Sequence, residues 1–422
     1  MSDFKKVFKS AFYMYMVQGL NFLVPFLILP YLLKTLSVQS FGVYSFAFAF
    51  TQFVLLFVDF GFNISATKKI AENYDNSLFI IKSFWNIIFI KFFLAIIALI
   101  FVIIGIVFII KLKVYSSAIL FSFIMVLGTV FFPVWWFQGV NRIKELACIA
   151  TFSKIVTYPL MFILVKQKND FNLAIIIQSL SFLFSGSIAL IYIFKNDSNY
   201  FKNISLPSFN EVIHEIKEAF PIFLSNSSIS LYTNSVTIFL GFFSTDYNVG
   251  LFGAMERVVR TICFGVLGPL NQVVFPMLIR QKSDNYNQAL KFFEKLLYLI
   301  FFLMVVSYLL FYVLKPYLLE HFFRNYFNIS LLLNVFMIMI FPIALGGVFG
   351  QLGLLGLGNE KDKKYFSKIY IIVGILSVPF TLGLIKFYQL RGAILAMLIV
   401  EIFIFILFST YFYRNIFPRR KL

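Results

Sequence analysis

Long runs of apolar residues alternate with short polar segments along the whole chain. A helix that crosses the hydrocarbon core of a bilayer needs about 20 residues, and each run is at least this long. Charged residues or clusters of Gly, Pro, Asn and Ser separate the runs. We predict twelve membrane-spanning helices, at residues 7–33, 41–64, 84–110, 115–138, 143–165, 171–194, 219–244, 249–279, 292–314, 330–357, 366–386 and 391–413.

The composition supports an integral membrane protein. Of the 422 residues, 61% are hydrophobic and 13% are charged, and the mean hydropathy is +0.90. A soluble protein needs more polar surface than this chain supplies, so the composition excludes a soluble domain and a disordered chain. Cys148 and Cys263 lie in apolar runs, and His214 and His321 lie in separate loops. We therefore expect no metal, no cofactor and no catalytic triad.

The basic residues indicate how the chain is oriented. There are 36 Lys and Arg against 18 Asp and Glu, a formal net charge of +18, which in a soluble protein would indicate nucleic-acid binding. If the N-terminus is cytoplasmic, about 23 basic residues lie in cytoplasmic segments, about 9 in the opposite loops and about 4 within spans, as the positive-inside rule requires. We predict a multi-pass protein of the cell inner (plasma) membrane with both termini cytoplasmic. Nucleic acid is not needed to explain the charge.

The chain is predicted to consist of two similar halves. The longest polar connection separates the sixth and seventh runs, and two short signatures recur in the same order: Ser37 to Tyr44 resembles Ser244 to Phe252, and Gln138–Asn141 resembles Gly356–Asn359. Such a repeat is typical of an internal duplication. We predict two six-helix bundles, at residues 1–200 and 219–422, joined by a cytoplasmic linker at 201–218. Halves with an even number of spans have the same orientation, so we expect a pseudo-two-fold axis along the membrane normal and a central cavity.

Two arginines inside the eighth predicted span are the first candidates for function. An ionised side chain at the centre of a bilayer costs about 2.5 to 3.5 kcal/mol on insertion scales, so such residues usually have a role. Arg257 and Arg260 are three residues apart and share one helix face, where they could bind a phosphate or pyrophosphate group. Glu256 precedes Arg260 by four residues, and a structural ion pair between the two is the alternative.

Four further charged residues fall within or near spans. Lys154 lies near the centre of the fifth span and is predicted to face the cavity, whereas Lys91 could either bind substrate or mark the inner end of its helix. Glu401 lies midway along the last span. We predict that it carries a proton or that it pairs with Lys154 or with an arginine. Asp59, near the inner end of the second span, and Glu256 complete the proton-coupling candidates, although an interfacial position is the favoured interpretation of Asp59.

Neutral polar residues gather in the first and seventh predicted spans, far too densely for helices that face lipid. We expect these faces to line a water-filled cavity, although some of the small hydroxyls will serve helix packing. The candidates for substrate binding in this set are Gln18, Asn21, Asn226 and Asn234. Trp135 and Trp136 end the fourth span, where we expect an interfacial aromatic belt.

Three segments resemble a known family. They are Pro30 to Leu32 leading to Phe41-Gly42-Val43-Tyr44-Ser45, Asp59-Phe60-Gly61-Phe62-Asn63-Ile64-Ser65-Ala66-Thr67, and Trp135-Trp136-Phe137-Gln138-Gly139. Together with twelve predicted spans, they resemble the Wzx-type O-antigen flippases. These belong to the polysaccharide-transport branch of the multidrug/oligosaccharidyl-lipid/polysaccharide (MOP) exporters. The motifs are concentrated in the first half, so the resemblance extends to Arg257 and Arg260 by position and charge only.

The resemblance implies an all-α MOP exporter that is not an enzyme. Such a protein would flip undecaprenyl-diphosphate-linked oligosaccharide from the cytoplasmic to the periplasmic leaflet by alternating access, with a cationic cavity and in some members proton antiport. Membrane lipids, and the polysaccharide polymerase and chain-length regulator, are the implied partners. An exporter of capsule or exopolysaccharide units remains an alternative. A polymerase or glycosyltransferase fits less well because the outer loops are short, and a cationic cavity has the wrong sign for a multidrug cation antiporter.

Overall fold

The computed structural model describes residues 27–321 and 330–421, and these residues form helices joined by short loops, with no β-strand among them. Gln18, Asn21 and most of the first predicted span lie outside the described residues. Eight helical segments in the described part are long and apolar enough to cross a membrane. They are Val38–Glu72, Ser77–Phe108, Ser116–Gly139, Ile143–Leu164, Phe171–Asn196, Tyr286–Glu320, Ser330–Leu357 and Glu360–Arg419. The protein is thus an all-α integral membrane protein, and the count of twelve spans stays a prediction.

The chain divides into two compact units. The first unit is Thr35–Ser230, and the second unit is Leu231–Leu422 with the N-terminal segment up to Lys34. The boundary at Ser230 falls inside the seventh predicted span. The bundles at 1–200 and 219–422, the linker at 201–218 and their pseudo-symmetry stay predictions.

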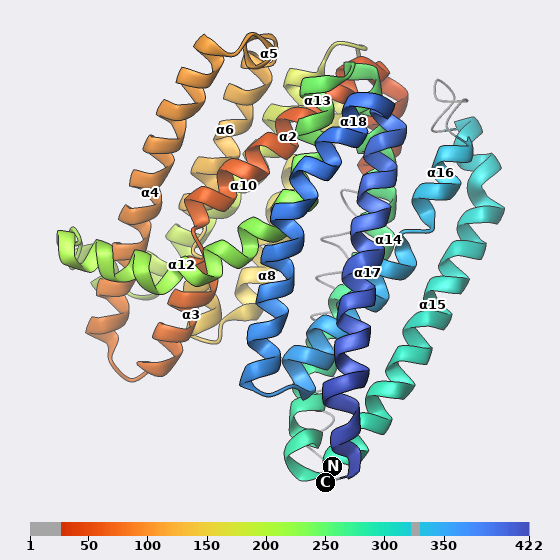
Figure 1. The fold of residues 1–422 in the computed structure, drawn as a ribbon. Helices are drawn as coiled ribbons and strands as arrows, with labels where there is room; N and C mark the ends of the chain where they lie inside the picture. Colours follow the sequence, from red (N-terminus) through yellow and green to blue (C-terminus); the bar gives the residue numbers. More distant parts are fainter. Residues whose placement is uncertain (1–26, 322–329, 422) are drawn as a thin grey trace. The chain divides into compact units, whose positions relative to one another are not determined.

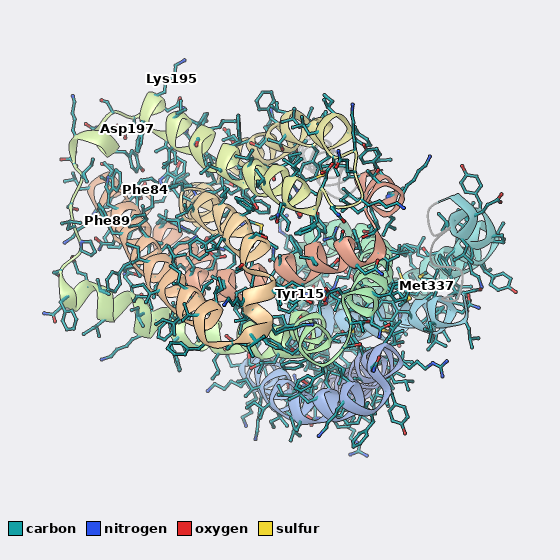
Figure 2. The ribbon with its side chains drawn as sticks, turned by 90° about the horizontal axis from the view of Figure 1, so that it is seen from above. Phe84, Phe89, Tyr115, Lys195, Asp197 and Met337 are labelled. Carbon is teal, nitrogen blue, oxygen red and sulfur yellow. The ribbon has the colours of Figure 1, made fainter. Side chains whose placement is uncertain are left out.

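In the first unit, α6 and α10 pack at backbone contact. A Cβ atom on Gly128 of α6 would collide with the backbone of Phe182 and Leu183, and one on Gly186 of α10 would come within 2.6 Å of the Gly128 carbonyl oxygen. Small residues at such a crossing let two helices approach closely. Lys195 projects outward from the C-terminal end of α10 (Figure 2). The helices of this unit are α2 Val38–Asp59, α3 Phe62–Glu72, α4 Ser77–Phe108, α5 Ile110–Val114, α6 Ser116–Val130, α7 Val134–Gly139, α8 Ile143–Thr157, α9 Pro159–Leu164, α10 Phe171–Asn196, α11 Asn199–Lys202 and α12 Phe209–Tyr232.

The family-like segment after Asp59 forms a break between α2 and α3. Phe60 and Gly61 have φ angles of 44° and 86°, in the left-handed region that glycine adopts without a steric penalty. Gly61 also lies against α12, where an added Cβ atom would come within 2.9 Å of the carbonyl oxygen of Ala219. This motif position is therefore occupied by glycine for two local reasons, its conformation and its close contact with α12.

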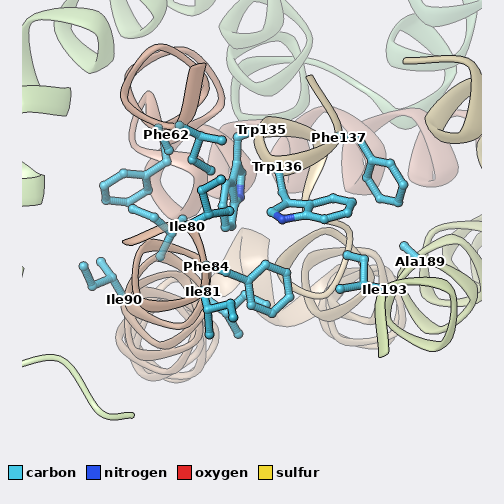
Figure 3. Packing of buried hydrophobic residues seen from close by; sticks show 14 of the residues in the cluster. Phe62, Ile80, Ile81, Phe84, Ile90, Trp135, Trp136, Phe137, Ala189 and Ile193 are labelled. Carbon is cyan, nitrogen blue, oxygen red and sulfur yellow. The ribbon is translucent and has the colours of Figure 1, made fainter. Parts of the chain in front are cut away.

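The tryptophans after Pro133 belong to the core of the first unit. Trp135 and Trp136 are only 0% and 5% exposed, and Trp136 donates a hydrogen bond from Nε1 to the Tyr200 hydroxyl over 2.9 Å. Figure 3 shows both rings beside Phe84, whose ring centroid lies 5.8 Å from that of Trp135. The predicted interfacial belt is wrong here, because these rings pack against α4 and α11 rather than against the bilayer surface.

In the second unit, α18 contains a sharp kink. Gln389 has φ 48° and ψ −122°, which divides the helix between the predicted spans 366–386 and 391–413. Gly392 follows, where an added Cβ atom would collide with the Leu384 carbonyl oxygen. The helices of this unit, labelled in Figure 1 where there is room, are α13 Asn234–Phe243, α14 Asp246–Asp284, α15 Tyr286–His321, α16 Ser330–Met337, α17 Ile340–Gly347, the π-helix η2 Val348–Leu357, α18 Glu360–Tyr411, and the short η3 Phe412–Ile416 and η4 Phe417–Lys421.

Candidate functional site

The second unit contains a partly buried ionic cluster centred on α14. The guanidinium group of Arg260 donates to Oε1 of Glu256 from Nε over 2.8 Å, and its second nitrogen lies 2.7 Å from the same oxygen. From α13, the Thr237 hydroxyl donates to Oε2 of Glu256 over 3.2 Å. The Arg260 and Glu256 side chains are 29% and 13% exposed. The ion pair that the sequence offered as an alternative is therefore formed, and part of the Arg260 side chain remains exposed although its Nη2 atom is buried.

Glu401 of α18 is the second carboxylate of this cluster. It is 8% exposed, and it interacts electrostatically with Arg260, as does Tyr232 at the end of α12. The Tyr232 ring is stacked on Tyr370 of α18, with ring centroids 6.1 Å apart and planes inclined by 2°. Two carboxylates thus share the field of one guanidinium. The sequence offered an arginine as a possible partner for Glu401 but could not say which one, and it gave no sign of the tyrosines.

Arg257 lies on the same helix, three residues before Arg260, and is half-buried. It interacts with other groups of the protein, so it belongs to a wider polar environment rather than standing alone. With Arg257, Arg260, Glu256 and Glu401 all ionised, the formal charge of the four side chains sums to zero. An anionic ligand that replaces a carboxylate as the partner of a guanidinium would therefore make the site negative, unless a carboxylate takes up a proton at the same time.

The seventh predicted span is not one continuous helix. It is interrupted at Thr233, which has φ −105° and ψ −80°, between α12 and α13. The Ser228 and Ser235 hydroxyls donate to the carbonyl oxygens of Leu224 and Leu231, contacts that compete with helix hydrogen bonds and often bend helices. Broken helices at membrane depth occur where they are buried in protein or line a cavity. The density of hydroxyls in this run was the available signal for the break.

The candidates in this run fall on the two sides of the break. Asn226 lies in α12 within the first unit and is half-buried, whereas Asn234 is the first residue of α13 in the second unit. Lys154 is also half-buried, in α8 of the first unit. Of the predicted substrate-binding residues that the structure describes, Asn234, Arg257 and Arg260 lie in the same unit as Glu401. Whether the residues of the two units act together stays a prediction.

Lys91 and Asp59 form a buried ion pair in the first unit. The Lys91 ammonium lies 2.6 Å from Oδ1 of Asp59 and donates to the Thr129 carbonyl oxygen over 3.1 Å. Lys91 is 0% exposed, so it presents no surface to a ligand in this conformation. The contact connects α2, α4 and α6. The sequence gave these two residues separate roles, and the geometry favours a structural role for the pair.

The predicted linker contains part of a long helix, α12, which Figure 1 shows crossing the line of α4 within the first unit. Its acidic residues pair with lysines of neighbouring helices: Glu215 with Lys69 over 2.6 Å, and Glu211 with Lys82 over 2.5 Å. The hydrogen bond from Lys82, followed by that from the Ser208 backbone N–H, lowers the pKa of Glu211 to about 2. Since the folded pKa is depressed, this pair contributes stability above the ordinary pKa of 4.5 and loses it only as the pH falls toward 2.

The fold matches those of known transporters. A structure described as an inward-facing conformation of a multidrug resistance MATE family transporter of the MOP superfamily superposes with a TM-score of 0.69 at 14% identity, covering 93% of this chain and 95% of that one. A crystal structure of MATE in the straight conformation has a TM-score of 0.59 at 14% identity, covering 99% of this chain and 96% of that one. At these identities the similarity shows the fold alone.

Sequence comparison shows the family. The profile of the family described as "Polysaccharide biosynthesis protein" matches residues 7–282. A protein of Escherichia coli (strain K12) named "Putative O-antigen transporter" is 30% identical over 403 residues, covering 93% of both chains. A protein of the same name from Shigella dysenteriae is 30% identical over 400 residues, covering 94% of this chain and 97% of that one. The chain therefore belongs to the polysaccharide biosynthesis protein family, among relatives named as O-antigen transporters, and has the fold of MOP superfamily transporters.

Proposed function

We propose that this protein is a flippase that moves a diphosphate-linked, lipid-anchored oligosaccharide from the cytoplasmic to the periplasmic leaflet of the inner membrane. The observation that carries the proposal is the partly exposed side chain of Arg260, whose guanidinium is held by Glu256 inside an otherwise apolar region of α14. Arginine binds phosphate groups through paired hydrogen bonds. The O-antigen transporters that are similar in sequence support the same class of substrate, and the transporter fold supports an alternating-access cycle.

In this proposal the Glu256 carboxylate holds the place that a phosphate takes when substrate binds. Its two contacts to Arg260, of 2.7 and 2.8 Å, fix the guanidinium before the ligand arrives. Fixing a long side chain in advance lowers the entropy that is lost when the ligand binds. Arg257, three residues earlier on α14, supplies a second cation for the other phosphate of a diphosphate.

Reconstitution of the purified protein tests the proposal. Proteoliposomes would contain a polyprenyl-diphosphate-linked disaccharide, and a non-permeant galactose oxidase would detect the sugars that reach the outer surface. We expect the lipid-linked disaccharide of the inner leaflet to become accessible to galactose oxidase faster than in liposomes without protein or in liposomes with heat-inactivated protein. An equal rate in all three, with the protein still monodisperse, would exclude flipping of this substrate.

We also propose that Glu401 couples transport to protons. Its carboxylate is nearly buried in α18, and it shares Arg260 with Glu256. The Arg260 guanidinium stabilises the charged form of Glu401 less well when it also has another anionic partner. Glu401 therefore takes up a proton most readily when a phosphate binds to Arg260. Binding of the anionic head group and of a proton would then be linked at a single residue.

Replacing Glu401 by Gln is therefore expected to remove the dependence of flipping on a pH gradient in proteoliposomes, while flipping without a gradient continues. The amide keeps the size of the side chain and cannot exchange a proton. The matched control is Glu360→Gln on the same helix, where the side chain is 80% exposed and paired with Lys363. An unchanged response of the Glu401 variant to the gradient would eliminate this residue as the proton carrier.

The orientation is tested by labelling single cysteines in a variant that lacks the two native cysteines. With both termini in the cytoplasm, a cysteine at Asp246 should react with a non-permeant maleimide in intact cells, and one at Asn196 should react only after permeabilisation. The positive-inside asymmetry is the reason for this expectation. Labelling in the reverse pattern would invert the proposed direction of transport.

A further inference from the structure

A basic pocket lies at the beginning of α18, apart from the cluster around Arg260. It is shallow and open, with a volume of about 400 Å³, and is lined by Lys363, Lys364, Ser367, Lys368 and Ile371, all on α18. These residues recur on one side of the helix, three and four positions apart, so their side chains share a face. Three ammonium groups and one hydroxyl can therefore meet a single ligand, with an isoleucine at the end that lies deeper in the apolar segment.

The acidic residues at this end of α18 are already engaged. The buried Asp362 accepts hydrogen bonds from both terminal nitrogens of Arg419 over 2.7 and 3.1 Å, and a third from the Tyr411 hydroxyl over 2.9 Å. Glu360 lies 2.7 Å from Lys363 and is 80% exposed. Arg419 thus neutralises Asp362, and Glu360, which also interacts electrostatically with Lys364, can balance one of the three lysine charges of the pocket.

Lys364 and Lys368 carry the excess charge. Among the residues that the structure describes, no carboxylate lies within ion-pair distance of either ammonium group. They are four residues apart, and like charges at this spacing on a helix repel each other. Nearby, partial burial and then the charges of Lys363 and Arg419 lower the pKa of Lys282. Without a bound anion, the cations at this end of the unit repel one another.

The positive-inside rule explains why lysines occur at this end of the helix. It does not explain why these lysines line one pocket. The pocket also lies at a particular depth. Lys363 and Lys364 precede the span predicted at 366–386, whereas Ser367, Lys368 and Ile371 lie within its first two turns. If this span crosses the bilayer as predicted, the pocket lies where lipid phosphates meet the hydrocarbon core, about 15 Å from the bilayer centre.

We propose that this pocket binds the phosphate of a membrane lipid, with Lys364 and Lys368 as its main cationic contacts and Ile371 beside the first part of the acyl or prenyl chain. The site is distinct from the one around Arg260. Lys282, which contacts the Gly358 carbonyl next to α18, is 22 residues beyond Arg260 on α14, about 33 Å at 1.5 Å per residue. The inference does not depend on the proposed flippase activity.

Native mass spectrometry of the full-length protein in detergent tests the site, with farnesyl diphosphate, phosphatidylglycerol and uncharged farnesol as separate probes. We expect Lys364→Gln/Lys368→Gln to weaken binding of at least one phosphate-bearing probe about 25-fold, since each lysine near a lipid phosphate contributes on the order of a fivefold change. Farnesol should bind the parent and the variant equally. Because both lysines are exposed, we expect the variant to fold, which its melting temperature would verify.

The matched control is Lys291→Gln/Lys295→Gln on α15, which removes two exposed lysines at the same spacing from the same unit. We expect it to change binding less than twofold. Loss confined to farnesyl diphosphate identifies a lipid diphosphate as the ligand, whereas an equal loss for phosphatidylglycerol identifies a general phospholipid site. An equal loss in the control, or no loss in the Lys364/Lys368 variant, would overturn the proposal, and neither result bears on whether the protein flips lipid.

Discussion

Replacing Arg257 and Arg260 together by Gln is expected to abolish export of the polysaccharide while the protein still inserts into the membrane. The two guanidinium groups are the cations of the buried cluster in the second unit, and Arg260 keeps part of its surface accessible although Glu256 holds it. Loss of two charge-assisted contacts of about 1.5 to 3 kcal/mol each would weaken head-group binding at least a hundredfold. Surface polysaccharide, measured by immunoblotting in a strain that lacks the chromosomal gene, is the readout.

The control for this variant is Arg280→Gln, which makes the same change at an exposed arginine on the same helix. It should leave export unchanged. Membrane-fraction abundance of all variants shows whether insertion is intact. If the double variant is inserted and makes normal polysaccharide, Arg257 and Arg260 do not bind the substrate.

A further variant separates ligand binding from a structural ion pair. If Arg260 serves only to neutralise Glu256, Arg260→Gln alone should impair export because it leaves the Glu256 carboxylate unpaired. The double variant Glu256→Gln/Arg260→Gln should then restore export, because no unpaired charge of this pair remains buried. If Arg260 binds the head group, this variant stays inactive. Arg260→Lys should recover only part of the activity, since lysine keeps the charge but lacks the planar fork that binds phosphate through paired hydrogen bonds.

The positions of the spans were largely predictable because the insertion of a segment into the membrane depends on its local hydrophobicity. The predicted start at Ile143 is the first residue of α8, and the predicted run at 171–194 corresponds to α10, Phe171–Asn196. The breaks after Val130 and Thr157, inside the spans predicted at 115–138 and 143–165, were not predicted, although they fall near Pro133 and Pro159, residues that disfavour a continuous helix. These features follow from residues that are neighbours in the chain.

Contacts between helices were less predictable. The pair Glu256–Arg260 could be proposed from its spacing of four residues on one helix. The contact of Lys91 with Asp59 could not, because it joins two helices whose packing depends on side chains of the whole first unit. The break at Thr233 was missed for a related reason: no Pro or Gly lies at this position, and only the hydroxyl contacts to the backbone show why the helix bends.

The second large effect is expected for the ion pair of Asp59 and Lys91. Replacing Asp59 by Asn should lower the free energy of unfolding by about 3 to 5 kcal/mol, the cost of leaving a buried charge without its partner. The remaining contact of the ammonium, to the Thr129 carbonyl, is too weak to compensate for a charged partner at 2.6 Å. Equilibrium unfolding in mixed detergent micelles measures the difference from the parent protein.

Asp59 and Lys91 differ in burial, so we expect replacement of one to cost more stability than replacement of the other. The Lys91 side chain is 1% exposed and that of Asp59 is 26% exposed, so water can solvate the carboxylate but not the ammonium. Lys91→Met should therefore cost less than Asp59→Asn. The double variant Asp59→Asn/Lys91→Met should recover most of the loss, because it leaves no buried charge and keeps the apolar volume of the lysine stem.

The surface pair of Lys68 and Glu72 on α3 is the control, with side chains that are 76% and 61% exposed and atoms 3.7 Å apart. Exposed pairs contribute little, so Lys68→Met should not measurably change stability. Equal costs for Asp59→Asn and Lys68→Met would show that the buried contact does not hold α2 to α4. If the pair is purely structural, transport per folded molecule should be unchanged in Asp59→Asn/Lys91→Met, whereas a loss of transport in that stable variant would assign the pair a part in the transport cycle itself.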